Sequence, residues 1–473
     1  MPTDAKEDTT VAKQDPPKVV DATLSQDPVR SEHEIQIGRR RLAYDVTTGF
    51  LPLVNDKGDL EAHLFFTAYE LRASKEQRAR RPLMFSFNGG PGSSSVWLHL
   101  GALGPRRVRM RDDGMMPPLP FELIDNDQTW LAASDLVFID PVDTGYSRAT
   151  TEELAKSFKD VDEDISSIGR FIRLFLTRQK RWTSPLFLVG ESYGTFRAAG
   201  LSAHLIEQGI AFNGIVLVSS VLDLQTLRFT SGNDLPYILY LPTYAATAWY
   251  HKRLTDTVQR RDLRELLREV EVWSLSEYAL ALAKGNDLRE RERKSVVERI
   301  RRYTGVDQSF IDESNLRIEI HRFCKELLRG ERRTVGRLDS RHLGSDALAV
   351  SEFPDFDPSM AAIRPPFTAT FNHYVRDELG FETDAEYHIL RGLDWNWGNA
   401  EAGFAGTAMA LQDAFSRNPY QHLFVASGLY DLATPYFATD YTLAHLGVNA
   451  PARDRVYVEK YEVGHMVYLE SNA

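Results

Sequence analysis

Short apolar runs, each followed at once by turn-forming residues, recur through the first half of the chain. They occupy residues 83–87, 136–139 and 186–189. Short runs that are almost entirely apolar are typical of parallel strands, because both faces of such a sheet are covered. An apolar stripe at helical spacing, residues 165–176, lies between the second and third runs. Strands that alternate with helices predict an α/β protein with a mainly parallel central sheet.

The chain begins with two predicted segments of different character. Residues 1–34 are polar and charged and contain two adjacent prolines, so we expect a disordered tail. Residues 35–222 form the first part of the α/β domain. They open with a predicted antiparallel hairpin over residues 35–71, in which apolar and polar residues alternate on either side of a turn.

The second half of the chain predicts an insertion and then a return to the sheet. Residues 223–391 are dominated by charged, helix-favouring stretches, which indicate a mainly helical insertion. Strand-like runs return at 423–426 and 456–458, so residues 392–473 are expected to complete the sheet. We expect the insertion to cap the carboxyl ends of the strands, where ligands bind in open α/β sheets.

Charge and composition narrow the range of partners. A formal net charge of −11 disfavours nucleic acid as a partner, because phosphate binding calls for clustered Lys and Arg. No apolar run approaches the roughly 18 residues of a membrane span, and the amino-terminal segment lacks the apolar core of a signal peptide. The one cysteine, Cys324, excludes an intramolecular disulfide and is expected to be a structural thiol on an amphipathic helix.

A Gly-Glu-Ser-Tyr-Gly run at residues 190–194 lies between the third apolar run and a predicted helix. A sharp strand-to-helix turn needs small residues on both sides of a nucleophile, and it raises the serine hydroxyl above the sheet. The amino terminus of the helix then lies beneath that hydroxyl. This context favours Ser192 as a nucleophile over a glycine-rich turn without chemistry. It predicts a serine hydrolase of the α/β-hydrolase fold.

A serine hydroxyl is a weak nucleophile unless a histidine, itself held by a carboxylate, removes its proton. In α/β-hydrolases the order along the chain is serine, acid, histidine, so both partners are sought after Ser192. Asp431 and His465 each follow a predicted strand, in loops where the carboxyl ends of strands meet. His422, at a strand start, and His445, in a predicted helix, are the alternative histidines. We therefore take Asp431 and His465 as the candidate acid and base.

The Asn-Gly-Gly-Pro-Gly run at residues 88–92 follows the first apolar run. Flexible glycines let backbone N–H groups turn towards a developing oxyanion. Taken alone, these residues fit a simple turn equally well. In α/β-hydrolases an early loop supplies one oxyanion donor, and the residue after the nucleophile supplies the other. Beside a nucleophilic serine, the run is therefore a candidate oxyanion site.

Four blocks, in order, resemble the serine carboxypeptidase family, peptidase family S10. They lie at residues 88–95 with Leu-Gly-Pro at 103–105, at 140–147, at 190–194, and at 464–467 after Ser-Gly-Leu-Tyr-Asp at 427–431. The likeness runs from about residue 35 to the end and is weakest through the insertion. It strengthens the assignment of Ser192, Asp431 and His465 as a catalytic triad.

The resemblance implies further roles. Gly90 and Tyr193 would donate backbone N–H groups to the oxyanion, and Asn88, Gly89 and Glu191 would bind the terminal carboxylate of a peptide substrate. A glutamate can bind a carboxylate only when it is protonated, which burial near another acid or an anionic substrate favours. This links activity in the family to acidic pH. The resemblance implies no metal or organic cofactor.

The sequence departs from the family pattern at several positions. Ser86 stands where many members have a tryptophan, and Ala102 where they have a second glutamate, so half of the carboxylate-binding network is missing. The missing acid removes one cause of Glu191 protonation. Ser93 replaces a cysteine that is usually disulfide-bonded, which suggests a bacterial-type member. The sequence does not indicate the compartment, and cytoplasm and periplasm both stay open. The chain also stops eight residues after His465, short of the family's last helix.

Together, these observations predict a serine-type carboxypeptidase that hydrolyses the C-terminal bond of peptides through an acyl-enzyme intermediate. An esterase or acyltransferase is the nearest alternative, because the weakened carboxylate site would suit either activity. A catalytically inert binding protein on the same fold is a third hypothesis, against which the complete triad argues. The sequence does not indicate the preferred side chains of the substrate, or the oligomeric state.

Overall fold

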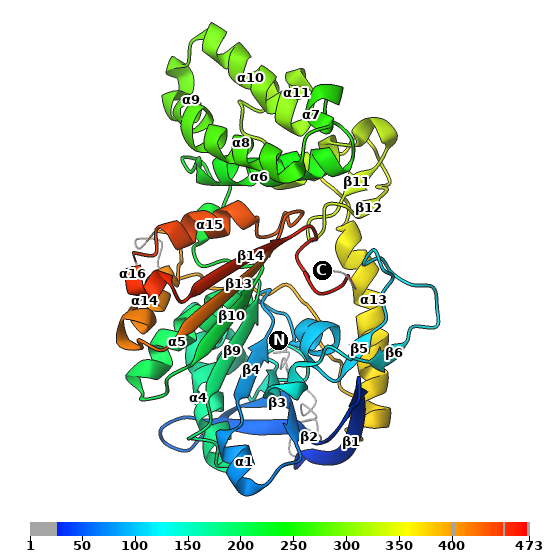
Figure 1. Cartoon of the computed structure of the whole chain (residues 1–473), viewed down its shortest axis with the longest axis vertical. Coiled ribbons are helices and arrows are strands. Elements are labelled where there is room, and N and C mark those ends of the chain that lie inside the picture. Colours follow the sequence, from blue (N-terminus) through cyan, green and yellow to red (C-terminus); the bar gives the residue numbers. More distant parts are fainter. Residues whose placement is uncertain (1–25, 399–402, 448–449, 471–473) are drawn as a thin grey trace, which may run out of the picture.

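The computed structural model describes residues 26–398, 403–447 and 450–470 of the chain. A central sheet forms the lower half of the molecule, and a group of helices forms a cap above it (Figure 1). Residues 1–25 of the expected tail lie outside the described residues. Residues 29–34 belong to strand β1, so the predicted boundary at residue 34 was wrong. The exposed face of β1 carries Arg30, Glu32 and Glu34. This strand pairs with β2, but its charged composition resembles that of a disordered tail.

The main sheet contains ten strands within the described residues, in the order β1-β2-β3-β7-β4-β9-β10-β13-β14, with β8 paired to β3. Strands β7, β4, β9, β10, β13 and β14 run parallel, whereas β1, β2 and β3 form an antiparallel edge. The strands are β1 (Val29–Ile37), β2 (Arg40–Val54), β3 (Leu60–Leu71), β4 (Leu83–Phe87), β7 (Asp135–Ile139), β8 (Arg148–Ala149), β9 (Leu186–Glu191), β10 (Gly214–Val218), β13 (His422–Gly428) and β14 (Val456–Tyr461). The mainly parallel sheet predicted from the apolar runs is confirmed.

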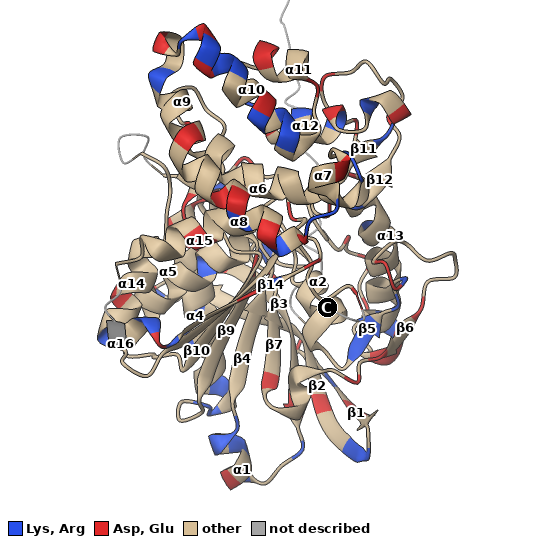
Figure 2. Cartoon of the chain, turned by 45° about the horizontal axis from the view of Figure 1, so that its top comes forward, with Lys and Arg blue, Asp and Glu red and all other residues tan. Residues whose placement is uncertain are grey.

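Side chains of the parallel strands alternate between two cores, one on each face of the sheet. In β4, Phe85 and Phe87 face a core that includes α4 and α5, while Met84 faces a second core that includes α2 and α13. Strands β4 and β10 accordingly carry no charged side chain in Figure 2. The helices around the sheet are α1 (Lys75–Arg80), α2 (Val96–Leu98), α3 (Glu152–Ser157), α4 (Val161–Gln179), α5 (Tyr193–Glu207), α13 (Pro358–His373), α14 (Ala408–Arg417), α15 (Tyr436–Ala444) and α16 (Ala450–Arg453).

The helical cap follows β10 in the chain. Its helices are α6 (Leu235–Tyr250), α7 (Asp256–Gln259), α8 (Leu263–Trp273), α9 (Ala279–Lys284), α10 (Glu290–Thr304), α11 (Gln308–Glu313) and α12 (Ile320–Glu326). They enclose a core of their own, which includes Leu239, Leu266 and Phe323 and extends to Tyr436 of α15. Acidic and basic residues are interspersed on the outer helix α10 (Figure 2). In the described ranges, no helix combines the length and the apolar character that a membrane span requires.

The predicted end of the insertion at residue 391 was wrong. After the cap, the chain forms the small sheet β11 (Thr334–Val335) and β12 (Leu343–Gly344) and then enters α13, which runs down beside the main sheet (Figure 1). Ile363, Phe367 and Phe371 of α13 share a core with Tyr69 of β3. The helical character of this segment could be predicted, but periodicity does not identify the surface on which a helix packs. Helix α13 therefore belongs to the sheet domain rather than to the cap.

The remaining elements are short. A second small sheet pairs β5 (Arg106–Val108) with β6 (Leu123–Asp125). Single 3₁₀ turns occupy Trp130–Ala132, Leu224–Thr226, Gly285–Asp287 and Arg329–Glu331, and π-helical turns occupy His99–Leu103, Ser274–Tyr278 and Tyr374–Glu378. The parallel sheet, the helices on both of its faces and the strand-turn-helix at β9 and α5 together make the α/β-hydrolase fold that the sequence predicted.

Candidate active site

Ser192 occupies the sharp turn between β9 and α5. Its backbone has φ 58° and ψ −130°, a left-handed conformation that is costly for a residue with a side chain. The neighbouring glycines are required by close backbone contacts. A Cβ atom at Gly190 would lie 2.1 Å from the carbonyl oxygen of Gly194, and one at Gly194 would lie 2.7 Å from that of Phe87. These contacts hold the strained turn that presents the serine side chain.

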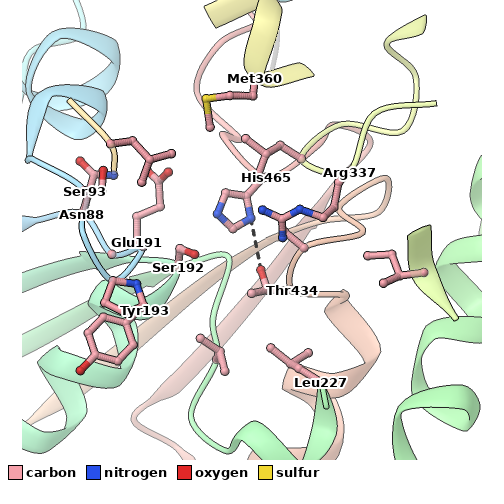
Figure 3. A pocket seen from close by; sticks show the side chains of 18 of the residues that line it. Asn88, Ser93, Glu191, Ser192, Tyr193, Leu227, Arg337, Met360, Thr434 and His465 are labelled. Atoms are coloured by element: carbon pink, nitrogen blue, oxygen red, sulfur yellow. Dashed lines mark hydrogen bonds between the residues drawn. The ribbon is translucent and has the colours of Figure 1, made fainter. Parts of the chain in front are cut away.

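A cavity of about 750 Å³ lies between the carboxyl ends of the strands and the cap. Ser192, Glu191 and His465 line it from the sheet domain, and Leu227 and Tyr240 line it from the segment that leads into the cap and from α6. Figure 3 shows Ser192, Glu191 and His465 on the wall of this cavity. The cap therefore roofs the site, as expected for a ligand pocket in an open α/β sheet.

Asp431 and His465 meet in the loops that follow β13 and β14. The Nδ1 atom of His465 lies 2.7 Å from Oδ2 of Asp431. The other carboxylate oxygen accepts the backbone N–H groups of Ala433 at 2.8 Å and Thr434 at 3.0 Å. The Thr434 hydroxyl also donates to Oδ2 of Asp431 at 2.8 Å. These three hydrogen bonds fix the carboxylate of Asp431. Because Asp431 contacts Nδ1 of His465, the Nε2 atom of the imidazole stays available to the pocket.

The environment of His465 favours its protonated form. Burial by itself lowers the pKa of this imidazole, but the charge and hydrogen bond of Asp431, together with the charge of Glu191, outweigh burial and raise the pKa above 6.5. An imidazolium formed during proton transfer is therefore stabilised. This is the property required of a base that takes the proton of a serine hydroxyl.

The turn at residues 88–92 packs directly on the start of α5. A Cβ atom at Gly89 would lie 2.3 Å from the backbone nitrogen of Tyr193, so only glycine fits there. Gly90 has φ 102°, which glycine alone adopts readily. Gly90 and Tyr193 both line the cavity beside Ser192. The two predicted oxyanion donors are thus brought to the same wall as the serine.

Glu191 is the acid next to Ser192 in the pocket. The residue is 3% exposed, and burial raises its pKa to about 7, although the charge of His465 and hydrogen bonds from Tyr468 and Asn88 lower the pKa in part. The Tyr468 hydroxyl donates to Oε2 of Glu191 at 2.5 Å. Burial therefore keeps Glu191 substantially protonated near neutrality without a second glutamate beside it.

Sequence reasoning missed two residues that support these groups. Thr434 clamps Asp431, and its position three residues after an aspartate is a pattern of local side-chain capping that could have identified it. Tyr468 lies close to Ala102. A Cβ atom at Gly101 would lie 2.5 Å from Cε2 of Tyr468, so the tyrosine ring rests against the segment where the family has its second glutamate. No local pattern in the sequence indicates this long-range contact.

The other candidate residues lie elsewhere. His422 stacks on Tyr457, and His445 contacts the carbonyl oxygen of Tyr441, so neither belongs to the cavity as it is formed by the described residues. Cys324 is buried in α12, where burial raises the pKa of its thiol well above the ordinary value. Such a thiol is a poor nucleophile. Within the ranges that the structure describes, no group of three or more His, Cys, Asp or Glu side chains is arranged to hold a metal ion.

Comparison with known proteins identifies the family. The model of the serine carboxypeptidases, peptidase family S10, matches residues 39–275, which is half of the chain. The chain belongs to this family. The matched region includes the turn at residues 88–92, Glu191 and Ser192. Asp431 and His465 lie beyond it.

Relatives in this family share short regions of the chain. Retinoid-inducible serine carboxypeptidase of Mus musculus is 30% identical over 169 residues, 34% of each chain. Pheromone-processing carboxypeptidase KEX1 of Komagataella phaffii is 34% identical over 148 residues, 31% of this chain and 21% of that protein. Serine carboxypeptidase-like 19 of Arabidopsis thaliana is 27% identical over 156 residues, 32% of this chain and 31% of that protein. The matches span about a third or less of the length of these relatives.

Proposed function

We propose that the chain is a serine-type carboxypeptidase that hydrolyses the C-terminal bond of peptides through an acyl-enzyme. The main support is Glu191, a buried acid with a pKa of about 7 next to the candidate nucleophile. A protonated carboxyl group in such a position can donate a hydrogen bond to a carboxylate, whereas an ionised one would repel it. Substrates that end in a free carboxylate, one residue beyond the bond to be cut, fit this arrangement.

In the proposed reaction, the Ser192 hydroxyl attacks the carbonyl carbon of the penultimate residue while His465 takes its proton. Asp431 holds the imidazole and stabilises its positive charge. The backbone N–H groups of Gly90 and Tyr193 stabilise the oxyanion. His465 then protonates the amine of the departing amino acid. Water, activated by His465, attacks the acyl-enzyme and releases the shortened peptide.

Recognition of the terminal carboxylate is assigned to Asn88, Gly89 and Glu191. Asn88 is buried, and its side-chain oxygen accepts the backbone N–H of Leu98 at 3.0 Å, which fixes the orientation of the amide. The amide also donates a hydrogen bond to Glu191. A substrate carboxylate at this end of the pocket would place the last peptide bond over Ser192, so the enzyme would remove residues from the C-terminus rather than cut internally.

An esterase or acyltransferase is the second candidate, and Ala102 is the observation that favours it. Without the second glutamate, the site holds a carboxylate less firmly, and an acyl donor without a free carboxylate becomes competitive. A catalytically inert binding protein is the third candidate. The hydrogen bond between Asp431 and His465 argues against an inert binding protein, because a protein that only binds ligands does not need an oriented base.

A time course followed by mass spectrometry separates these candidates. The substrates are one peptide with a free C-terminus, the same peptide as its C-terminal amide, and a simple ester of its acyl residue. A carboxypeptidase shortens the free peptide stepwise from its C-terminus and acts much more slowly on the amide. Preference for the ester would favour the second candidate, and no labelling of Ser192 by a fluorophosphonate probe would favour the third. Ser192→Ala is the control for background hydrolysis.

We further infer a bacterial-type member of the family. The support is the cysteine-poor chain and Ser93, which accepts a hydrogen bond from Trp97 at 2.8 Å where the family usually has a disulfide-bonded cysteine. The relatives compared above are eukaryotic. Unchanged thermal stability in reducing and non-reducing buffer would agree with a fold that depends on no disulfide.

A further inference from the structure

Arg337 is held in place by both loops of the candidate triad. Its carbonyl oxygen accepts the backbone N–H of Leu432, next to Asp431, at 3.0 Å. The following carbonyl, that of Leu338, accepts the N–H of His465 at 2.7 Å. The backbone of Arg337 therefore cannot move without moving the acid and the base. Its side chain extends from this fixed point into the cavity (Figure 3).

The guanidinium group of Arg337 has no ion pair and no side-chain hydrogen bond within the part of the chain that the structure describes. The two nearby acids are engaged elsewhere. Asp357 accepts the backbone N–H groups of Arg337 and Ser359, both at 3.0 Å, at the start of α13. Glu319 accepts the N–H of His321 at 2.9 Å at the start of α12. The cavity thus contains a cation whose charge no neighbour neutralises directly.

An unpaired cation at this position opposes the proposed chemistry. The charge of Arg337 lowers the pKa of His465, because it disfavours the imidazolium that forms when the serine loses its proton. A bound anion beside the guanidinium would remove this penalty and would form charge-assisted hydrogen bonds. An anion on the substrate is therefore the partner that best explains an arginine here.

The position of Arg337 identifies which part of the substrate carries the anion. In Figure 3, Asn88 and Glu191 lie on one side of Ser192, and Arg337 lies on the other side, beyond His465. Under the proposed function, on which this step rests, the terminal carboxylate occupies the side of Asn88 and Glu191. The opposite side receives the residue that becomes the acyl group. We propose that Arg337 binds an acidic side chain of that residue, so the enzyme prefers Glu or Asp at the penultimate position of a peptide.

The test compares blocked dipeptides that differ only in the penultimate residue, which is Glu, Gln or Lys, before a constant C-terminal leucine. The readout is the ratio of kcat/KM for the Glu and Gln substrates within one enzyme, so differences in folding or in overall activity cancel. A charge-assisted hydrogen bond should make this ratio about tenfold or more in the wild type. Fluorophosphonate titration of Ser192 confirms that each variant has a competent active site.

Three variants locate the effect. Arg337→Met should bring the Glu/Gln ratio close to one, and Arg337→Lys should retain part of it because the charge remains. Arg228→Met is the matched control. Arg228 also lines the cavity, but it is exposed and its guanidinium stacks over Trp397, 4.9 Å from the ring centre. We expect this variant to keep the wild-type ratio, since it removes the same charge without removing the contact.

The outcomes distinguish this inference from the proposed function. Hydrolysis of all peptides with a wild-type ratio near one would overturn the role of Arg337 and leave the carboxypeptidase intact. An equal loss of the ratio in Arg228→Met and Arg337→Met would also overturn it, because a diffuse positive field would then suffice. A preference for acidic residues at the C-terminal position instead would contradict the side assigned to Arg337. No hydrolysis of any peptide would refute the proposed function itself.

Discussion

Glu191 is the group whose protonation should control the affinity for a peptide carboxylate. Burial raises its pKa to about 7, and the charge of His465 and the hydrogen bonds of Tyr468 and Asn88 moderate this rise. The protonated acid donates to the substrate carboxylate, and the ionised acid repels it. Binding is therefore complete at pH values below the pKa and is lost as the pH rises through it.

The size of the effect follows from that pKa. Glu191 should be about 90% protonated at about pH 6 and about 10% protonated at about pH 8, so KM for a free-carboxylate peptide should rise about tenfold over this interval. Tyr468→Phe removes a donor to the ionised form. Since such a bond contributes about 1.5 kcal/mol and one pKa unit corresponds to about 1.4 kcal/mol, the rise in KM should shift about one pH unit higher. Glu191→Gln should abolish it.

The assay is KM against pH for one peptide and for its C-terminal amide. The amide has no free carboxylate, so its KM changes only with ionisations that are unrelated to carboxylate binding. One of these is the ionisation of His465, which interacts with Glu191. Ala102→Glu restores a second acid and should extend tight peptide binding to higher pH. A flat wild-type profile for the peptide, or the same rise for peptide and amide, would refute carboxylate recognition by Glu191.

Three further substitutions test the triad and its support. Ser192→Ala should lower kcat by roughly 10³-fold or more with an unchanged melting temperature, and retention of most activity in the purified variant would exclude Ser192 as the nucleophile. Asp431→Asn should lower kcat by about 10⁴-fold with little change in the Kd of a product peptide, because His465 would adopt the wrong tautomer. An unaltered kcat would exclude Asp431 from the triad. Gly89→Ala should lower both kcat and the melting temperature, since its Cβ would lie 2.3 Å from the backbone nitrogen of Tyr193, and normal values of both would contradict that contact.

The fold could be predicted from the sequence where local patterns decide the structure. The apolar runs at 83–87, 136–139 and 186–189 became β4, β7 and β9, because a strand buried on both faces is predominantly apolar. Ser192 could be identified because the glycines of the turn are a local requirement. The patterns were less informative at the edges of the fold. Strand β1 is polar on its exposed face. Helix α13 is only weakly amphipathic, so its sequence does not indicate that it packs on the sheet rather than within the cap.

The candidate site was predictable only as far as its motifs extend. Asn88, Glu191 and His465 lie in short runs with a chemical signature. Arg337 lines the pocket and Tyr468 supports Glu191, and both do so through contacts between distant segments. Tyr468 meets Glu191 across 277 positions of the chain. Because Ala102 stands where the family has a glutamate, the sequence predicted that Glu191 would lose one cause of its protonation. In the structure, the pKa of Glu191 is raised chiefly by burial. Burial depends on the whole fold and cannot be derived from a motif.

The pKa of His465 depends on three ionisable groups around it, so it should change when a substrate binds. Asp431 and Glu191 raise the pKa of the imidazole, and Arg337 lowers it. Without a bound anion, the proton on Glu191 and the charge of Arg337 both disfavour the imidazolium, because the first removes a negative charge and the second adds a positive one. An acidic side chain bound to Arg337 would neutralise the positive charge that lowers the pKa of His465. Asp431 would then raise this pKa without opposition from Arg337. Binding of a substrate with the matching charge would therefore strengthen the base at the moment when Ser192 must lose its proton.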